Sequence, residues 1–273
     1  MNALVGEKLA IITSKAQTTR HRIMGVVNGN DFQIVYSDTP GIIEKPSYKL
    51  QESMMDFVRS SLRDADVLLI VTEYNEKEID SFWHKVKDIP VPKIFIINKI
   101  DKAKNNEDVF NKLKYWKDNG IVADEYIPVS ALENFNIETV FNSILKYLPE
   151  HPPYFDKNVL TDKAMRFFVT EIIREKILLN YKQEIPYSVE VVVDTYEEED
   201  NVDKILAIIY CNRASQKPIL IGRQGIMMKK VGTAARLDIE DFTGKKCYLE
   251  LLVKVRENWR TDDNFLKRFG YKE

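Results

Sequence analysis

The sequence predicts an α/β domain followed by a smaller α+β domain, and three observations support this. Apolar runs and amphipathic stretches alternate up to about residue 148, as in a mainly parallel sheet covered by helices on both sides. Three prolines then fall within residues 149–153, where they cannot continue a helix and favour an extended connection. The order of elements changes beyond them. We therefore expect a first domain over residues 1–148, a linker over 149–160 and a second domain over 161–273.

The first domain begins with an antiparallel hairpin. Two β-branched runs flank the turn signal Asn28-Gly29-Asn30-Asp31. The continuous apolar run 67–71 predicts a strand buried on both faces. The elements expected are hairpin strands over 22–28 and 32–37, further strands over 67–71, 93–98 and 126–129, and helices over 48–63, 76–87, 107–118 and 137–148.

The second domain has a different element order, which predicts a three-stranded sheet with helices. The acidic run 197–200 falls between two strands and indicates a solvated hairpin loop. The elements expected are helices over 162–180, 227–236 and 258–268, and strands over 188–194, 204–211 and 246–255.

Composition excludes several classes of protein. Apolar residues make up 44% and charged residues 30% of 273 residues, which is globular rather than disordered or fibrous. No apolar run is long enough to span a membrane, and two cysteines are too few for a disulfide scaffold or a zinc site. The three histidines are scattered and form no metal or catalytic pattern, which favours surface or linker positions.

Charge is uneven along the chain. Residues 204–237 contain seven Lys or Arg and no Asp or Glu. Such a stretch attracts polyanions by releasing counterions from phosphates. The alternative is a solvated helix face.

Asp38-Thr39-Pro40-Gly41 ends an apolar strand, where ligands meet parallel sheets. An Asp there holds Mg²⁺ through water, and a Gly amide approaches a terminal phosphate closely because Gly has no side chain. Taken alone, the tetrapeptide could also be an ordinary turn.

Asn98-Lys99-Ile100-Asp101 follows the apolar strand 94–97. A carboxylate at this place accepts two hydrogen bonds from N1 and the 2-amino group of guanine, a donor pair that adenine lacks. The aliphatic stem of Lys99 can lie along the guanine ring. Ser130-Ala131 follows the next strand, where a backbone amide reaches the guanine O6.

In this order and at these spacings, the three elements resemble the G3, G4 and G5 motifs of GTPases, which implies a Ras-like sheet. The segment from Lys15 to Arg22, with the sequence KAQTTRHR, looks like switch I of the Era family of bacterial GTPases. Residues 149–153, 171–176 and 184–188 are similar as well. The resemblance implies GTP and GDP as ligands, Mg²⁺, a monovalent cation, and GTP hydrolysis. It also implies that Thr18 or Thr19 closes over Mg²⁺ and the γ-phosphate.

Two features depart from the general GTPase pattern. Ile42 follows the Asp-Thr-Pro-Gly motif where Ras-type proteins place a water-orienting glutamine, so no catalytic residue is assigned. The phosphate loop G-x-x-x-x-G-K-S/T is absent, and residues 1–7 resemble the helix that follows that loop. We expect an N-terminally truncated GTPase domain in which the first strand is missing and two strands have unpaired inner edges.

Gly222 and Gly225 form a Gly-x-x-Gly turn between an apolar run and a basic helix. In KH domains such a turn presses its backbone against single-stranded RNA. An ordinary loop is the alternative, but this turn lies inside the acid-free stretch, so we expect a type II KH domain. The RNA-binding candidates are Ile221, Gly222, Arg223, Gln224, Gly225, Ile226, Lys229, Lys230 and Arg236.

Two functions follow from the resemblance and the residues. One is an Era-type GTPase that binds the 3′ end of 16S rRNA and assists assembly of the small ribosomal subunit, with the GTP state controlling RNA engagement. The other is a KH-type RNA-binding protein whose truncated GTPase domain neither binds nor hydrolyses GTP. The resemblance implies a cytoplasmic protein that is not an oligomer. It leaves peripheral contact with the inner face of the cell membrane open, and nothing in the sequence argues for an anchor.

Overall fold

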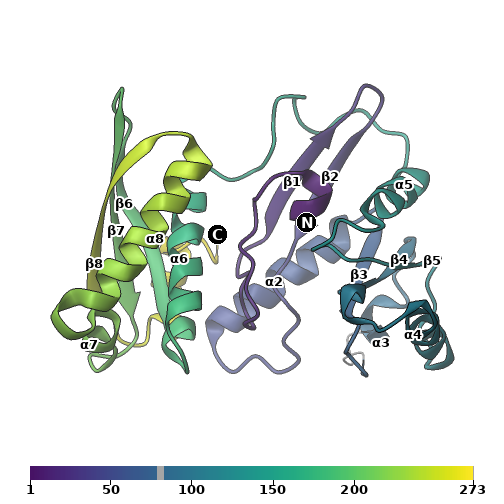
Figure 1. The fold of residues 1–273 in the computed structure, drawn as a ribbon, viewed down its shortest axis with the longest axis horizontal. Coiled ribbons are helices and arrows are strands. Elements are labelled where there is room, and N and C mark those ends of the chain that lie inside the picture. Colours follow the sequence, from purple (N-terminus) through teal and green to yellow (C-terminus); the bar gives the residue numbers. More distant parts are fainter. Residues whose placement is uncertain (79–82, 273) are drawn as a thin grey trace. The chain divides into compact units, whose positions relative to one another are not determined.

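A computed structural model describes residues 1–78 and 83–272 (Figure 1). The chain divides into two compact units, and each is described by itself. Unit 1 comprises residues 1–7, 25–37 and 58–160, and unit 2 comprises residues 8–24, 38–57 and 161–273. Two segments from the first half of the chain thus belong to the same unit as the C-terminal third. The domain boundaries expected from the sequence remain a prediction.

Unit 1 contains most of a hairpin and a parallel sheet. The hairpin strands β1 (Ile23–Asn28) and β2 (Gln33–Asp38) pair with each other, and the Gly29 amide donates to the Phe32 carbonyl at 3.0 Å across the turn. The three strands β3 (Leu68–Glu73), β4 (Lys93–Asn98) and β5 (Glu125–Pro128) form a parallel sheet in that order. The hairpin and the strand–helix alternation predicted from the sequence are confirmed.

The helices of the first 148 residues agree with the expected ranges to within two residues, except for two short ones. The predicted helix over 76–87 lies partly outside the described residues. Helix α1 was expected only through the family resemblance. The helices are α1 (Asn2–Val5), α2 (Lys49–Asp64), α3 (Trp83–Val86), α4 (Asn106–Asp118) and α5 (Ile137–Tyr147).

Strand β3 is not buried on both faces, so that prediction was wrong. Val71 is 60% exposed, whereas Ile94, Phe95 and Ile97 of β4 are fully buried. The reason is that β3 is the edge of its sheet, while β4 has neighbours on both sides. Strand β2 belongs to a separate sheet from β3 in the part of the chain that the structure describes.

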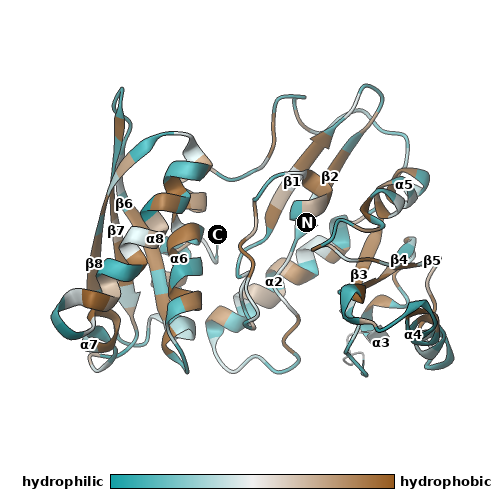
Figure 2. Ribbon diagram, viewed as in Figure 1, coloured by the Kyte–Doolittle hydropathy of each residue, from teal (hydrophilic) through white to brown (hydrophobic). Residues whose placement is uncertain are grey.

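Unit 2 is built around a three-stranded sheet with β7 in the centre. Strand β7 (Val202–Cys211) pairs antiparallel with β6 (Val189–Glu197) and parallel with β8 (Lys246–Val255). Helices α6 (Met165–Asn180) and α8 (Ile226–Thr243) lie side by side against the sheet (Figure 1). Figure 2 shows hydrophobic residues along β6 and β7, and many of them belong to the unit's core. The predicted three-stranded α+β arrangement is confirmed.

Two helices complete unit 2. Helix α7 (Gln216–Ile221) was not predicted, and α9 (Asp263–Arg268) is shorter than the helix expected over 258–268 because Trp259–Thr261 form a separate 3₁₀ turn. In the residues that the structure describes, we find no helix with the length and hydrophobicity needed to cross a bilayer.

Candidate functional site

Residues after β4 and β5 form one cluster in unit 1, here called the β4–β5 cluster: Asn98, Lys99, Asp101, Ser130 and Ala131. The Asn98 side-chain oxygen accepts hydrogen bonds from the Lys99 amide at 2.8 Å and the Ala131 amide at 3.1 Å. The Ser130 hydroxyl donates to Asp101 Oδ1 at 2.6 Å. These bonds tie the two loops together, as the sequence interpretation requires for one binding site.

Backbone geometry orients the same cluster. Parallel pairing places the ends of β4 and β5 at one edge of the sheet, and Lys99 takes a left-handed conformation (φ 63°) that turns the chain into the 3₁₀ turn Ile100–Lys102. Asp101 and Ala131 are exposed. The cluster thus presents an exposed carboxylate, the acceptor type that guanine N1 and the 2-amino group pair with, while the Ala131 amide is bonded to Asn98 in this structure.

Glu73 was not singled out from the sequence. It ends β3 and forms an ion pair with the Lys99 ammonium. Its sequence context, the end of an apolar strand, gave no signal of this contact, because only the parallel register between β3 and β4 brings the two residues together.

The end of β2 forms a second cluster, in unit 2. The Thr19 hydroxyl donates to Asp38 Oδ2 at 3.2 Å. Burial raises the pKa of Asp38, and the hydrogen bond from Thr19 opposes that shift. Of the adjacent residues, Thr39 and Ile42 are half-buried, Pro40 is buried, and Gly41 is exposed with open space where a Cβ would be.

The two threonines that the sequence left as alternatives, Thr18 and Thr19, form different hydrogen bonds. The Thr18 hydroxyl bonds within its own turn, at 2.6 Å from Thr13 Oγ1 and 2.7 Å from the Lys15 carbonyl. Only the Thr19 hydroxyl is bonded to Asp38 in the described structure.

The residues present fit a hard divalent cation. A carboxylate and a hydroxyl lie within hydrogen-bond distance of each other, and Mg²⁺ prefers oxygen donors and keeps several of its waters. Asp38 and Thr19 are therefore the residues that would hold Mg²⁺, whereas the Thr18 hydroxyl bonds within its own turn in this structure. The phosphate-loop sequence does not occur among the 273 residues, so no phosphate contact beyond these two residues and Gly41 is assigned.

The Gly-x-x-Gly turn connects α7 to α8 in unit 2. Gly222 has φ 73° and ψ 169°, Gln224 has φ 51° and Gly225 has φ 76°. A Cβ at Gly222 would lie 2.7 Å from Met227 Cγ, whereas a Cβ at Gly225 would have nothing within 4 Å. Gly222 thus maintains the turn, and Gly225 leaves the backbone accessible, as contact with a sugar-phosphate chain requires.

The side chains around this turn differ in availability. Arg236 forms an ion pair with Glu240 at 2.6 Å, so it is less available for phosphate than the sequence suggested. Ile221 is half-buried. The exposed candidates are Arg223, Gln224, Ile226, Lys229 and Lys230.

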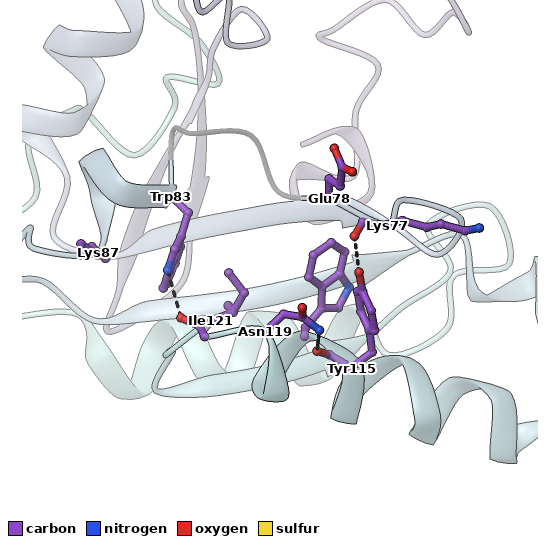
Figure 3. A pocket seen from close by; sticks show the side chains of 9 residues that line it. Lys77, Glu78, Trp83, Lys87, Tyr115, Asn119 and Ile121 are labelled. Atoms are coloured by element: carbon purple, nitrogen blue, oxygen red, sulfur yellow. Dashed lines mark hydrogen bonds between the residues drawn. The ribbon is translucent and has the colours of Figure 1, made fainter.

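A cavity of about 590 Å³ lies elsewhere (Figure 3). It borders α3 and α4, where the Trp83 indole donates to the Gly120 carbonyl at 3.2 Å and the Tyr115 hydroxyl donates to the Lys77 carbonyl. None of the candidate site residues lines it. Since residues 79–82, which adjoin it in sequence, lie outside the described part of the chain, we assign it no function.

Two protein-family models match the chain. A model described as 50S ribosome-binding GTPase matches residues 1–99, and a model described as KH domain matches residues 184–260. The first match covers the Asp38 motif and the start of the β4–β5 cluster, and the second covers the Gly-x-x-Gly turn.

Curated relatives match almost the whole chain. GTPase Era of Alkaliphilus metalliredigens is 43% identical over 277 residues, covering 99% of this chain and 92% of that protein. The chloroplastic GTPase ERA-like protein of rice is 42% identical, and this chain spans 65% of its length.

Solved structures agree with the sequence relatives. A crystal structure of Era in complex with MgGDPNP and nucleotides 1506–1542 of 16S ribosomal RNA gives a TM-score of 0.94 at 35% identity, covering 100% of this chain and 93% of that one. A variant of Aquifex aeolicus Era bound to GDP.AlF4⁻ gives a TM-score of 0.93 at 35% identity with the same coverage. With both family models, relatives matched over 99% of the chain and two structures in agreement, the chain belongs to the Era family of GTPases with a C-terminal KH domain.

Proposed function

We propose that this protein is a GTPase that binds the 3′ end of 16S rRNA through its KH domain and assists assembly of the small ribosomal subunit, with GTP and Mg²⁺ controlling RNA engagement. The observation that carries the proposal is that one chain holds both a guanine-matched cluster, with Asp101 fixed by Ser130, and an accessible Gly-x-x-Gly turn. The relatives bound to MgGDPNP, GDP.AlF4⁻ and 16S rRNA nucleotides support both halves.

Each cluster has a role in this proposal. Asp101 accepts from guanine N1 and the 2-amino group, and the Ala131 amide turns from its present acceptor, Asn98, to guanine O6. Asp38 and Thr19 hold Mg²⁺, which neutralises the charge of the phosphates. Arg223, Lys229 and Lys230 contact RNA phosphates, and the Gly-x-x-Gly backbone lies against the strand. The proposed location is the cytoplasm, with the small ribosomal subunit as partner and no oligomer.

Nucleotide binding is tested by titrating the chain with fluorescent GDP in the presence of Mg²⁺. We expect saturable binding that is competed by GTP and not by ATP. Asp101→Asn is expected to weaken GDP binding by about 10- to 100-fold, since it removes two hydrogen bonds to a charged acceptor. It should favour xanthine nucleotides, whose 2-oxo group accepts from the new amide.

A second candidate function is RNA binding without nucleotide binding by these residues. It is favoured by one observation, that the 273 residues contain no G-x-x-x-x-G-K-S/T sequence. An absence of GDP binding to the intact chain, with RNA binding retained, would support this candidate over the first.

RNA binding is tested with an oligonucleotide of the 16S rRNA 3′ end and the double variant Gly222→Asp, Gly225→Asp. We expect the two new carboxylates to repel the phosphates and abolish binding. Gly244→Asp is the matched control for the change at Gly225, because Gly244 likewise has positive φ (69°) and open space around it but caps the other end of α8. Unfolding of the double variant in urea is measured beside its RNA binding, since a side chain at Gly222 would meet Met227. Equal affinity of the double variant and the control would rule out the turn as the contact.

A further inference from the structure

The segment that carries Thr19 is fixed within unit 2 by buried and half-buried cations. The Lys15 ammonium donates to the carbonyls of Leu178 and Tyr181, at the C-terminal end of α6. The Arg20 guanidinium is fully buried and donates to the Val189 carbonyl at 2.9 Å and to Glu190 at 3.1 Å. These contacts attach the segment on both sides of the two threonines.

Arg174 contacts the segment between these two attachments. Its guanidinium is fully buried on α6 and forms a bidentate pair with Glu171, at 2.7 and 2.6 Å. The same Nη2 atom donates to the Thr18 carbonyl. A guanidinium held by two parallel bonds has a fixed plane, so the direction of its third bond is fixed as well.

The Thr18 carbonyl belongs to the peptide plane that ends at the Thr19 Cα. That plane is rigid, so a fixed Thr18 carbonyl also fixes the positions of the Thr19 nitrogen and Cα. Only the backbone torsions next to this plane then remain free. Gln17, just before it, is in the left-handed region at φ 55°, a conformation that neighbouring contacts must stabilise. The Thr19 hydroxyl then lies 3.2 Å from Asp38.

We propose that Arg174, assisted by Lys15, is a positioning residue for the nucleotide site: it holds the Thr18 carbonyl so that the Thr19 hydroxyl faces Asp38 where Mg²⁺ binds. The C-terminal helix α6 thereby contributes to the distinction between GTP and GDP. The effect on nucleotide binding rests on the proposed function, whereas the contacts of Arg174 and Lys15 do not depend on it. It also predicts that Arg174 touches neither nucleotide nor metal.

The contacts are tested first without nucleotide, by hydrogen exchange of the full chain followed by mass spectrometry. We expect Arg174→Gln and Lys15→Met each to raise the exchange rate of amides in residues 16–22 by about 10-fold, the effect of losing one charge-assisted bond. Arg166→Gln is the matched control, because Arg166 lies on the same helix but is exposed and directed to the Tyr196 carbonyl. Exchange unchanged within two-fold in both test variants would overturn the proposal.

Removal of Arg174 leaves Glu171 buried without its partner, so that variant can lose stability as a whole. The double variant Arg174→Gln, Glu171→Gln removes this charge, and Lys15→Met leaves the buried pair intact. Arg174→Lys is expected to restore part of the protection, since an ammonium retains one donor for the Thr18 carbonyl. Across the four variants, we expect the protection of residues 16–22 from exchange to depend on the contact to the Thr18 carbonyl. Protection that instead changes in proportion to the free energy of unfolding would contradict a positioning role.

The second readout separates positioning from general destabilisation. A threonine that reaches Mg²⁺ and the γ-phosphate affects a non-hydrolysable GTP analogue and not GDP. We therefore expect the double variant Arg174→Gln, Glu171→Gln and the variant Lys15→Met to weaken analogue binding by about 10-fold while GDP affinity changes less than two-fold. Equal losses for both nucleotides would overturn the positioning role. Failure of the unmodified chain to bind either nucleotide would overturn the proposed function, while the hydrogen-exchange result would still decide on the contacts.

Discussion

Gly222 and Gly225 both have positive φ but differ in the space around them. A Cβ at Gly222 would lie 2.7 Å and 2.8 Å from side-chain carbons of Met227, while Gly225 has open space. Gly222→Ala is therefore expected to lower the free energy of unfolding by about 3 kcal/mol, from steric strain plus an unfavourable backbone region. Gly225→Ala should cost only about 1 kcal/mol.

The measurement is urea unfolding of both variants beside RNA binding. Because Gly225 faces open space, Gly225→Ala is expected to weaken RNA binding more than its small effect on stability explains. If the two alanine variants lost equal stability, the packing of Met227 against the turn would be contradicted.

His21 predicts a pH dependence of stability. It was expected on the surface, but it stacks on Tyr271 with ring centroids 4.2 Å apart, and burial lowers its pKa from 6.5 to about 3. Arg174 also lowers this pKa, whereas Glu171 opposes the shift. Between pH 6.5 and about 3 the unfolded chain binds more protons than the folded chain. Stability therefore falls as pH falls, by up to about 1.4 kcal/mol per pH unit from this group.

The test is urea unfolding of wild type and His21→Phe at pH 7.5 and pH 5.5. Phenylalanine retains the ring stacking and does not titrate. We expect the loss of stability between the two pH values to be smaller in the variant by about 1 kcal/mol. An equal loss in both proteins would show that His21 takes up its proton in the folded state.

Among the elements, α6 shows why some functional residues escaped sequence reasoning. The sequence singled out its residues 171–176 only through the family resemblance, yet Glu171, Arg174, Glu175 and Lys176 are all buried. Their cover includes the segment around Thr18, more than 150 positions away in sequence. Hydrophobic periodicity does not predict such a contact, because charged residues can also be buried when they form ion pairs.

Helix α7 was missed for a local reason. Pro218 lies inside Gln216–Ile221, and a proline in an apolar run argues against a helix. However, it is the third residue of the helix, where the backbone amide has no partner within the helix to lose. The strands and long helices, by contrast, followed from apolar runs and turn residues alone.

The edge position of β3 gives a further prediction. Val71 is 60% exposed on β3, whereas Ile94 on β4 is fully buried in the core formed with Ile34 and Tyr36. Val71→Thr is expected to change the free energy of unfolding by less than about 0.5 kcal/mol, and Ile94→Ala to lower it by about 2–5 kcal/mol. Thermal and urea unfolding compare the two. A large loss for Val71→Thr would mean that another segment covers this edge.

The basic start of α8 predicts how RNA affinity depends on salt. Each phosphate neutralised on a single strand contributes about −0.7 to the slope of log K against log salt concentration. Lys229→Ala and Lys230→Ala should therefore each make the slope less negative by about 0.7, with a uniform loss across RNA sequences. Lys204→Ala is the control, because Lys204 lies outside the turn and pairs with Glu199 at 2.6 Å. Equal slopes in all three variants would exclude α8 from phosphate contact.

At the scale of the whole molecule, the compact units combine segments that are far apart in the sequence. The sequence placed a boundary in the proline-rich linker, and Gly-x-x-Gly, Asp-Thr-Pro-Gly and Asn-Lys-Ile-Asp were all readable as motifs. No sequence pattern indicated that residues 8–24 and 38–57, which carry Thr19 and Asp38, belong to the same compact unit as residues 161–273. That membership depends on single side chains such as Arg20, whose partners lie 166 to 170 positions away.

The fragment 161–273 alone is therefore expected to be less stable than the same region in the full chain. Without Arg20, Glu190 loses a buried cation, a loss that costs about 3–5 kcal/mol in comparable pairs, so calorimetry should show a transition at least about 10 °C lower. Glu190→Gln provides the control, because its expected effect on the transition temperature differs between the full chain and the fragment. It should destabilise the full chain, where Arg20 then lacks its carboxylate, and should stabilise the fragment or leave it unchanged. Equal transition temperatures of fragment and full chain, or a loss from Glu190→Gln in both, would mean that the C-terminal domain holds its buried charges without the N-terminal segment.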